Sequence, residues 1–302
     1  MSVKTPLNVG NVAGSGRIGL TLHGRQAVFT ELSYRYPLKL LSPRVTEPTV
    51  AIAYVLTYGG GLVSGDRTHL HVDVGLGASL LLLTQGSTKV FKHRPGARLA
   101  KAAEEISDTF GASTVQRLEV HVQTDGLLLL LPDPITCFSA ASYNQVQTFH
   151  LEDGASVVVL DWITSGRMSR GEEWQFSRYY SVNEIWACKK RAARDVLLLE
   201  GCEDNARPLK ERMGIYSCYA TLFLCGPKLR TVVGALSADY HEICVYQQSS
   251  PSDLLWSMSC IEQGCVVRVA GMTTESVRQW IRTSLNRLEE HVGADVLGKA
   301  FL

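Results

Sequence analysis

The stretch Gly59-Gly-Gly-Leu-Val-Ser-Gly-Asp-Arg67 indicates how this chain folds. It follows an apolar run rich in β-branched and aromatic residues, Ala51 to Tyr58, and precedes the alternating run Leu70 to Val74. Glycines permit backbone angles that side chains forbid, so the stretch predicts a turn between two β-strands. Its glycine spacing resembles a phosphate-binding loop, but Asp66 stands where such a loop has lysine, and a carboxylate repels phosphate. Strands are therefore expected here, and a nucleotide site is not.

Short strand signals recur along most of the chain, bounded by Gly, Pro, Asp or Ser. Because few of them are separated by helical periods, the pattern is typical of a mainly β architecture rather than of alternating strands and helices. We expect strands at Thr49–Tyr58, His69–Val74, Ser79–Leu83, Leu118–Val122, Leu127–Leu131, Ser156–Trp162, Val196–Leu199, Ala220–Leu224, Arg230–Val233, Glu242–Tyr246 and Val266–Val269.

Apolar residues recur at every third or fourth position over residues 274–292, which predicts an amphipathic helix near the C-terminus. Shorter helical segments are expected at Leu209 to Met213 and Asp253 to Met258. The stretch 92–114 is rich in charge, Ala and Gly, and predicts a polar surface insertion. No composition break divides the chain, so we expect one domain over residues 1–302.

Composition excludes several classes of protein. The 302 residues carry 30 basic and 29 acidic side chains, and a net charge of +1 favours neither nucleic acid nor an anionic membrane. No apolar run reaches the roughly 20 residues of a membrane helix, and the N-terminus lacks the features of a signal peptide, so a cytoplasmic location is expected. The eight cysteines include no Cys-x-x-Cys pair; Cys260 and Cys265 are interpreted as buried thiols, with a ligand pair as the alternative.

Other motifs have structural interpretations that compete with the functional ones. Gly14-Ser-Gly-Arg-Ile-Gly19 matches the dinucleotide fingerprint, but no strand precedes it and no helix follows, so the match lacks its mechanism. No nucleophile elbow, zincin helix or kinase motif set occurs in the sequence.

His69, His71 and Asp73 alternate on an expected strand and so project from one face. Imidazoles with a carboxylate suit zinc or nickel, whereas alternating polar residues are also typical of a solvated sheet face. Glu119 and His121 alternate similarly elsewhere, and the sequence does not say whether the two strands are neighbours.

Five segments occur in order across most of the chain, from about residue 16 to residue 290, and together they resemble the UreD (UreH) family of urease accessory proteins. One further stretch, the polar segment 92–114, departs from the compact pattern of that family. The matching segments are Thr57-Tyr-Gly-Gly-Gly-Leu-Val-Ser-Gly-Asp66, Leu83-Thr-Gln-Gly-Ser-Thr-Lys89-Val-Phe, Leu131-Pro-Asp-Pro-Ile-Thr-Cys-Phe138, Asp161 to Phe176, and Arg212-Met213 near Ala220-Thr-Leu-Phe.

The resemblance implies a mainly β, β-helix-like flattened barrel with about two helices, one of them at the C-terminus. It implies a non-catalytic maturation factor that works with UreF and the GTPase UreG, binds urease apoprotein and passes nickel transiently through its interior, without a permanent cofactor. Matching motif positions make Asp66, Asp133, Asp161 and Glu172 candidates for the nickel route; His69, His71 and Asp73 are added by spacing alone.

The C-terminal helix is a candidate contact for UreF through Trp280 and Ile281, although packing on its own sheet is an equal alternative. Two other functions stay open at this point: a protein that stores nickel tightly, and an enzyme with a small-molecule pocket in a β-barrel.

Overall fold

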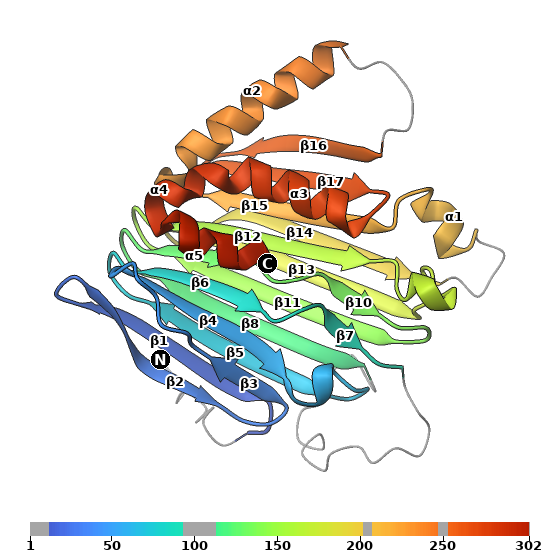
Figure 1. The fold of residues 1–302 in the computed structure, drawn as a ribbon, viewed down its shortest axis with the longest axis horizontal. Helices are drawn as coiled ribbons and strands as arrows, with labels where there is room; N and C mark the ends of the chain where they lie inside the picture. The colour runs from blue at the N-terminus through green and yellow to red at the C-terminus, as the bar shows by residue number, and fades with distance from the viewer. Residues whose placement is uncertain (1–11, 93–112, 202–206, 247–252, 302) are drawn as a thin grey trace, which may run out of the picture.

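The computed structural model describes residues 12–92, 113–201, 207–246 and 253–301, and they form two packed β-sheets with helices on one side (Figure 1). Sheet A has seven strands and sheet B has ten. In spatial order, sheet A contains β14 Lys190–Glu200, β13 Arg178–Ala187, β11 Ser142–Leu151, β8 Thr114–Val122, β5 Arg67–Val74, β1 Ser15–His23 and β2 Gln26–Tyr34. Sheet B contains β16 Leu254–Ile261, β17 Gly264–Gly271, β15 Cys218–Cys225, β12 Ser156–Thr164, β9 Leu127–Leu130, β6 Ser79–Thr84, β4 Val50–Thr57 and β3 Leu38–Leu41, with β10 Ile135–Cys137 beside β12 and β7 Thr88–Val90 beside β10.

The chain alternates between the sheets as a β-helix does. It runs from β4 in sheet B to β5 in sheet A and back to β6, and the same exchange repeats through β8, β9, β11, β12 and β13. Neighbouring strands of these coils are parallel within each sheet, so each coil adds one strand to each sheet. Antiparallel pairs such as β1–β2, β13–β14 and β12–β15 extend the sheets beyond the coils. The expected mainly β, β-helix-like architecture is confirmed. The described strands leave both sheets open, without closing a barrel.

The main core lies between the sheets, and a second core lies between sheet B and the helices. Leu80 and Leu82 of β6 face the first core, whereas Leu81 and Leu83 face the second. This explains why β6 and β9 are apolar at nearly every position: both of their faces are covered. The outer face of sheet A has no such cover in the described part of the chain, and β5 accordingly alternates between buried and half-buried residues.

Helices α2 Arg230–Tyr246, α3 Thr274–Leu285, α4 Glu289–Val292 and α5 Ala294–Gly298 cover the outer face of sheet B (Figure 1). The short helix α1 Leu209–Met213 lies apart from them, and its Leu209 is buried in the cluster that includes Tyr143 and Tyr179. Thr273 caps α3 by accepting a hydrogen bond from the Ser276 backbone N–H at 3.1 Å. The helix expected over residues 274–292 is confirmed, with a short 3-10 turn at Asn286–Leu288 inside it, and so is the helical segment at Leu209–Met213. No described helix has the length and apolar character needed to span a membrane.

Three expected elements are wrong. Arg230–Val233 and Glu242–Tyr246 are not strands, because both lie in α2. Val232 and Leu236 of this helix are buried against sheet B. Packing against the sheet therefore outweighs the strand propensity of these short segments. Asp253–Met258 is not helical, because Leu254 to Ile261 pair with β17 as an edge strand.

Two other expectations concern the polar insertion and the dinucleotide-like glycines. The insertion expected at 92–114 lies outside the described residues apart from its ends, and Thr114 already belongs to β8. Gly14 and the strand β1 after it show that the dinucleotide-like glycines serve packing instead: a Cβ on Gly14 would lie 1.9 Å from the Arg67 carbonyl oxygen.

Candidate functional site

The two ends of the sandwich differ in how the strands are joined. Four-residue turns at 75–78, 123–126 and 152–155 join sheet A strands to the next sheet B strands at one end. At the other end, longer connections leave β4, β6, β9 and β12 and enter β5, β8, β11 and β13. Because β4, β6, β9 and β12 run parallel in sheet B and β5, β8, β11 and β13 run parallel in sheet A, these connections lie at one edge, which we call the long-connection end. It contains Gly59–Arg67, Thr84–Phe91, Pro132–Phe138 and the segment after Asp161.

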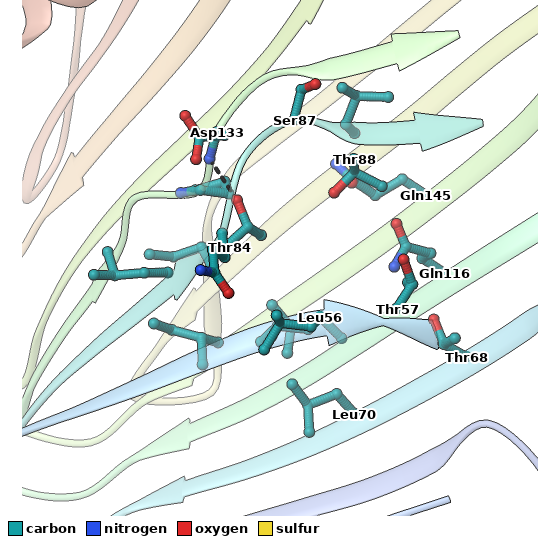
Figure 2. Close-up of a pocket in the computed structure, with 18 of the residues that line it drawn as sticks. Leu56, Thr57, Thr68, Leu70, Thr84, Ser87, Thr88, Gln116, Asp133 and Gln145 are labelled. Atoms are coloured by element: carbon teal, nitrogen blue, oxygen red, sulfur yellow. Dashed lines mark hydrogen bonds between the residues drawn. The ribbon is translucent and has the colours of Figure 1, made fainter. Parts of the chain in front are cut away.

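A cavity of about 200 Å³ opens between the sheets at the long-connection end. Figure 2 shows most of the side chains that line it. Sheet B and its connections supply Thr57, Thr84 and Asp133, and sheet A supplies Thr68, Gln116 and Gln145 from the starts of its strands. Leu56 and Leu70 also line the cavity, and Leu70 belongs to the apolar core between the sheets. The cavity is therefore polar on the side of the connections and apolar on the side of the core.

Asp161 of β12 projects from sheet B into the interior and is only 8% exposed. Its oxygens accept hydrogen bonds from Gln145 Nε2 at 3.1 Å, Tyr179 Oη at 3.1 Å, Ser181 Oγ at 2.6 Å and Asn183 Nδ2 at 2.8 Å. All four donors belong to β11 and β13 of sheet A. Burial, followed by the nearby Asp161 charge, raises the pKa of the Tyr179 hydroxyl well above its ordinary value, so Tyr179 stays a donor at neutral pH. None of these four donors carries a charge, so all four hydrogen bonds to the Asp161 carboxylate come from neutral groups.

Among the described residues, two buried acceptor atoms near this cluster have no hydrogen-bond partner: Asn183 Oδ1 and Gln147 Oε1. A buried polar atom without a partner is costly, and such atoms commonly mark water or ion positions. The interior beside Asp161 therefore has acceptor capacity beyond what the protein itself uses.

Asp133 lies at the rigid corner between β9 and β10 and also lines the cavity. Its Oδ2 accepts from the Gly86 backbone N–H at 2.9 Å, and its Oδ1 accepts from Arg278 Nη2 at 2.9 Å. Its own N–H donates to Thr84 Oγ1 at 2.7 Å (Figure 2). Both carboxylate oxygens of Asp133 thus hold neighbouring segments together.

The other two carboxylates from the family motifs lie at the same end but do not line the cavity. Asp66 Oδ2 accepts from the Val63 N–H at 2.9 Å within the glycine-rich turn, and burial raises the pKa of Asp66. Glu172 is held by both Arg167 Nε and Arg167 Nη2, and it also accepts from the Ser139 N–H at 3.3 Å. The hydrogen bond from Arg167 lowers the pKa of Glu172. Both side chains hold loops in place.

The histidine strand lies elsewhere. Thr68, Leu70 and Val72 of β5 face the interior, so His69, His71 and Asp73 face outward from sheet A. Burial lowers the pKa of His69, with Arg117 and His71 acting in the same direction against Glu119. The seven candidate residues are therefore in two groups, separated by the thickness of sheet A.

The two residues expected at a partner surface lie on α3. Ile281 is fully buried between α3 and sheet B. Trp280 is half-buried, with its ring 5.1 Å from that of Trp256. Ile281 therefore packs on the chain's own sheet, which is the alternative that the sequence left open. Of the two residues, only Trp280 is partly exposed.

Sequence reasoning missed the residues that surround Asp161. Gln145, Ser181 and Asn183 lie in strands that were not expected, and polar residues at alternate positions resemble a solvated face. Cys260 and Cys265 are cross-strand neighbours in β16 and β17, but Cys265 is buried and Cys260 is exposed.

Fold and site together define a class: mainly β proteins whose parallel coils enclose a polar cavity, with a buried carboxylate, at one end. Comparison with known proteins gives the family. The model described as "UreD urease accessory protein" matches residues 12–298. The chain belongs to this UreD family.

Curated relatives agree over most of their length. The chain is 36% identical to "Urease accessory protein 4" of Cryptococcus neoformans var. grubii over 291 residues, covering 90% of this chain and 89% of that protein. It is 34% identical to "Urease accessory protein D" of Oryza sativa subsp. indica over 297 residues, covering 90% and 91%. It is 38% identical to "Urease accessory protein UreD" of Sorangium cellulosum over 285 residues, covering 94% and 83%. Family membership gives the chain a role in urease maturation.

Proposed function

We propose that this chain is a non-catalytic adaptor that binds urease apoprotein together with UreF and the GTPase UreG, and that it passes nickel toward urease through its polar interior. The observation that supports this proposal is the buried Asp161 carboxylate beside the cavity at the long-connection end. Nickel is the cargo of such an adaptor and not a resident cofactor.

The chemistry around Asp161 suits weak and reversible binding of a hydrated cation. A passage must bind an ion well enough to admit it and loosely enough to release it. One carboxylate with amide and hydroxyl neighbours offers a single negative charge and several oxygen atoms, without imidazole or thiolate in the set. Such oxygen ligands bind borderline metals less tightly than nitrogen or sulfur ligands do. This donor set favours transit over storage.

Asp133 is the second carboxylate of the route that we propose, because it lines the same cavity as Asp161. Its hydrogen bonds to Gly86 and Arg278 fix its position, and Arg278 offsets its charge. Asp66 and Glu172 have a supporting role in this proposal, since they hold the surrounding connections. The contact with UreF is proposed for the exposed side of α3, where Trp280 is the accessible member of the original pair.

The test is nickel loading of urease with Asp161→Asn in place of the native residue. This substitution removes the charge and nearly preserves the shape, whereas Asp153→Asn, at an exposed turn on the opposite end, is the matched control. We expect Asp161→Asn to keep its binding to UreF in a pull-down assay while the nickel content of urease, measured by mass spectrometry, falls several-fold. The control is expected to load urease normally. Normal loading by a folded Asp161→Asn protein would refute the interior route.

A further inference from the structure

Several histidines and acids gather on the outer face of sheet A, away from the cavity. β5 and β8 are parallel neighbours, and their register places His71 beside Glu119 and Asp73 beside His121. β8 and β11 continue the row, with His121 beside His150. Since Val72 and Val120 point into the apolar core, these polar side chains all point outward.

Three of these side chains present donor atoms at the spacing of a metal site. One donor atom each from His71, Glu119 and His121 lies within 4.8 Å of the others. His71 Nδ1 lies 3.8 Å from Glu119 Oε2, and His121 Nε2 lies 3.5 Å from Glu119 Oε1. Ligands about 2.0–2.1 Å from a tetrahedral ion are roughly 3.4 Å apart, so small side-chain rotations would bring the three atoms to bonding distance. We propose that His71, Glu119 and His121 bind one divalent transition-metal ion.

The donor types indicate which ions fit. Two imidazole nitrogens and a carboxylate suit zinc, nickel or copper, whereas magnesium and calcium prefer oxygen ligands throughout. Asp73 Oδ2 is 3.2 Å from His71 Nε2 and can orient that ring through its second nitrogen, as acidic neighbours of metal-binding histidines do. The remaining coordination position is left to water.

Neighbouring groups hold the two imidazoles in place. The ring of His150 stacks on that of His121 with centroids 4.7 Å apart and an angle of 16°, which restricts rotation of the His121 ring. Arg17 Nη2 lies 3.5 Å from Asp73 Oδ2, and Arg17 Nε lies 3.3 Å from Glu31 Oε2, so Glu31 offsets part of the Arg17 charge. The three ligands are 23% to 42% exposed, so an ion can reach them directly from solvent.

This site is independent of the proposed nickel route. Sheet A and the apolar core, including the fully buried Val72 and Val120, separate it from Asp161. The site also differs in chemistry, because nitrogen ligands hold borderline metals more tightly than oxygens alone. It would therefore retain an ion on the surface, whatever happens in the interior.

The test is metal binding by the purified full chain, with Ni²⁺ and Zn²⁺ as probes in equilibrium dialysis after treatment with a chelator. The variant is His71→Ala/His121→Ala, and the matched control, His23→Ala/His241→Ala, removes two exposed histidines from outside the cluster. We expect the control to bind as the native chain does and the variant to bind one ion fewer per chain. Loss of a single outer partner of a metal ligand lowers affinity about 10–100-fold, so loss of two ligands should exceed that.

A second measurement separates loss of ligands from loss of fold. Glu119→Gln keeps the size of the side chain and removes its charge, and we expect weaker Co²⁺ binding with a changed visible absorption spectrum while circular dichroism stays native. Equal stoichiometry and affinity in the double variant and the native chain, or no binding by the native chain, would overturn the proposal. Because these experiments measure metal binding and not urease activity, they test this site independently of the interior route. Either proposal can be refuted while the other is supported.

Discussion

Arg278 of α3 donates a hydrogen bond from Nη2 to Asp133 Oδ1 at 2.9 Å, although 145 residues separate the two in sequence. Both side chains are about four-fifths buried, and the Arg278 guanidinium also lies 5.3 Å from the centre of the Trp162 ring. The pair ties the helical layer to the long-connection end of the sandwich. Movement of α3, if a partner binds there, would therefore act directly on the lining of the cavity.

Arg278→Ala should destabilise the protein by about 2 kcal/mol, because it leaves the mostly buried Asp133 without its charged partner. Arg282→Ala, on the exposed side of the same helix, is the control and should change stability by less than about 0.5 kcal/mol. Urea denaturation followed by circular dichroism measures both. Equal losses of stability in the two variants would show that the ion pair between Arg278 and Asp133 does not stabilise the fold.

Asp161→Ala should cost about 3 kcal/mol, since it removes the common acceptor of Ser181, Asn183, Tyr179 and Gln145 and leaves buried donors unsatisfied. Asp161→Asn keeps one oxygen and should cost less than half as much. Thermal unfolding of the two variants gives the comparison. A smaller loss for Ala than for Asn would contradict the role assigned to this hydrogen-bond cluster.

Gly14→Ala should destabilise strongly, by about 3 kcal/mol, because its Cβ would overlap the Arg67 carbonyl and its φ of 77° is unfavourable for alanine. Gly24 has φ of 63° but no atom near the position of a Cβ, so Gly24→Ala isolates the backbone term and should cost about 1 kcal/mol. Chemical denaturation measures the cost of each substitution, and the difference between the two costs gives the part that comes from the overlap with Arg67. Similar costs would mean that β1 and β5 can move apart at Gly14.

Thiol chemistry should distinguish the six cysteines whose side chains the structure describes. Burial raises the pKa of Cys225 to about 11 and those of Cys218 and Cys265 to about 12, and it raises that of Cys137 further. These groups stay protonated and inaccessible up to pH 9, whereas Cys188 and Cys260 are exposed.

The measurement is alkylation with iodoacetamide at pH 8 and pH 9, followed by peptide mass spectrometry. We expect label at Cys188 and Cys260 at both values, because both side chains are exposed. The denatured protein, in which every thiol should react, is the control. Native labelling of Cys218 or Cys265 would show that the core opens more readily than its packing suggests.

How far the sequence predicted the fold depends on what each strand faces. β6 and β9 are predictable because both of their faces pack on an apolar core, so nearly every residue in them is apolar. β5 is predictable because its inward and outward residues alternate. β11 and β13 were missed because Gln145, Gln147 and Ser181 point into the sandwich, where polar residues are unusual. The segments Arg230–Val233 and Glu242–Tyr246 of α2 resemble strands because four or five residues are too few to show a helical period.

The candidate site was predictable only in part. Family motifs led to Asp133 and Asp161, which line one cavity in the structure. They also led to Asp66 and Glu172, which lie in the connections at the same end of the sandwich. The hydrogen-bond partners of Asp161 could not be predicted, since they depend on which strands face each other across the sandwich. For the same reason, spacing alone gave His69, His71 and Asp73 but could not place Glu119 and His121 beside them.

The coiled path of the chain has a consequence for how the protein forms. Val50 pairs with Ser79, and Ser79 in turn pairs with Leu127. Each strand of a coil therefore pairs with a strand that lies one coil later in the sequence. Contacts between residues so distant in sequence slow folding, because a long loop must close before any pairing energy is gained. On the ribosome, both sheets would grow one coil at a time behind the emerging chain, each unfinished edge exposed until the next coil arrives.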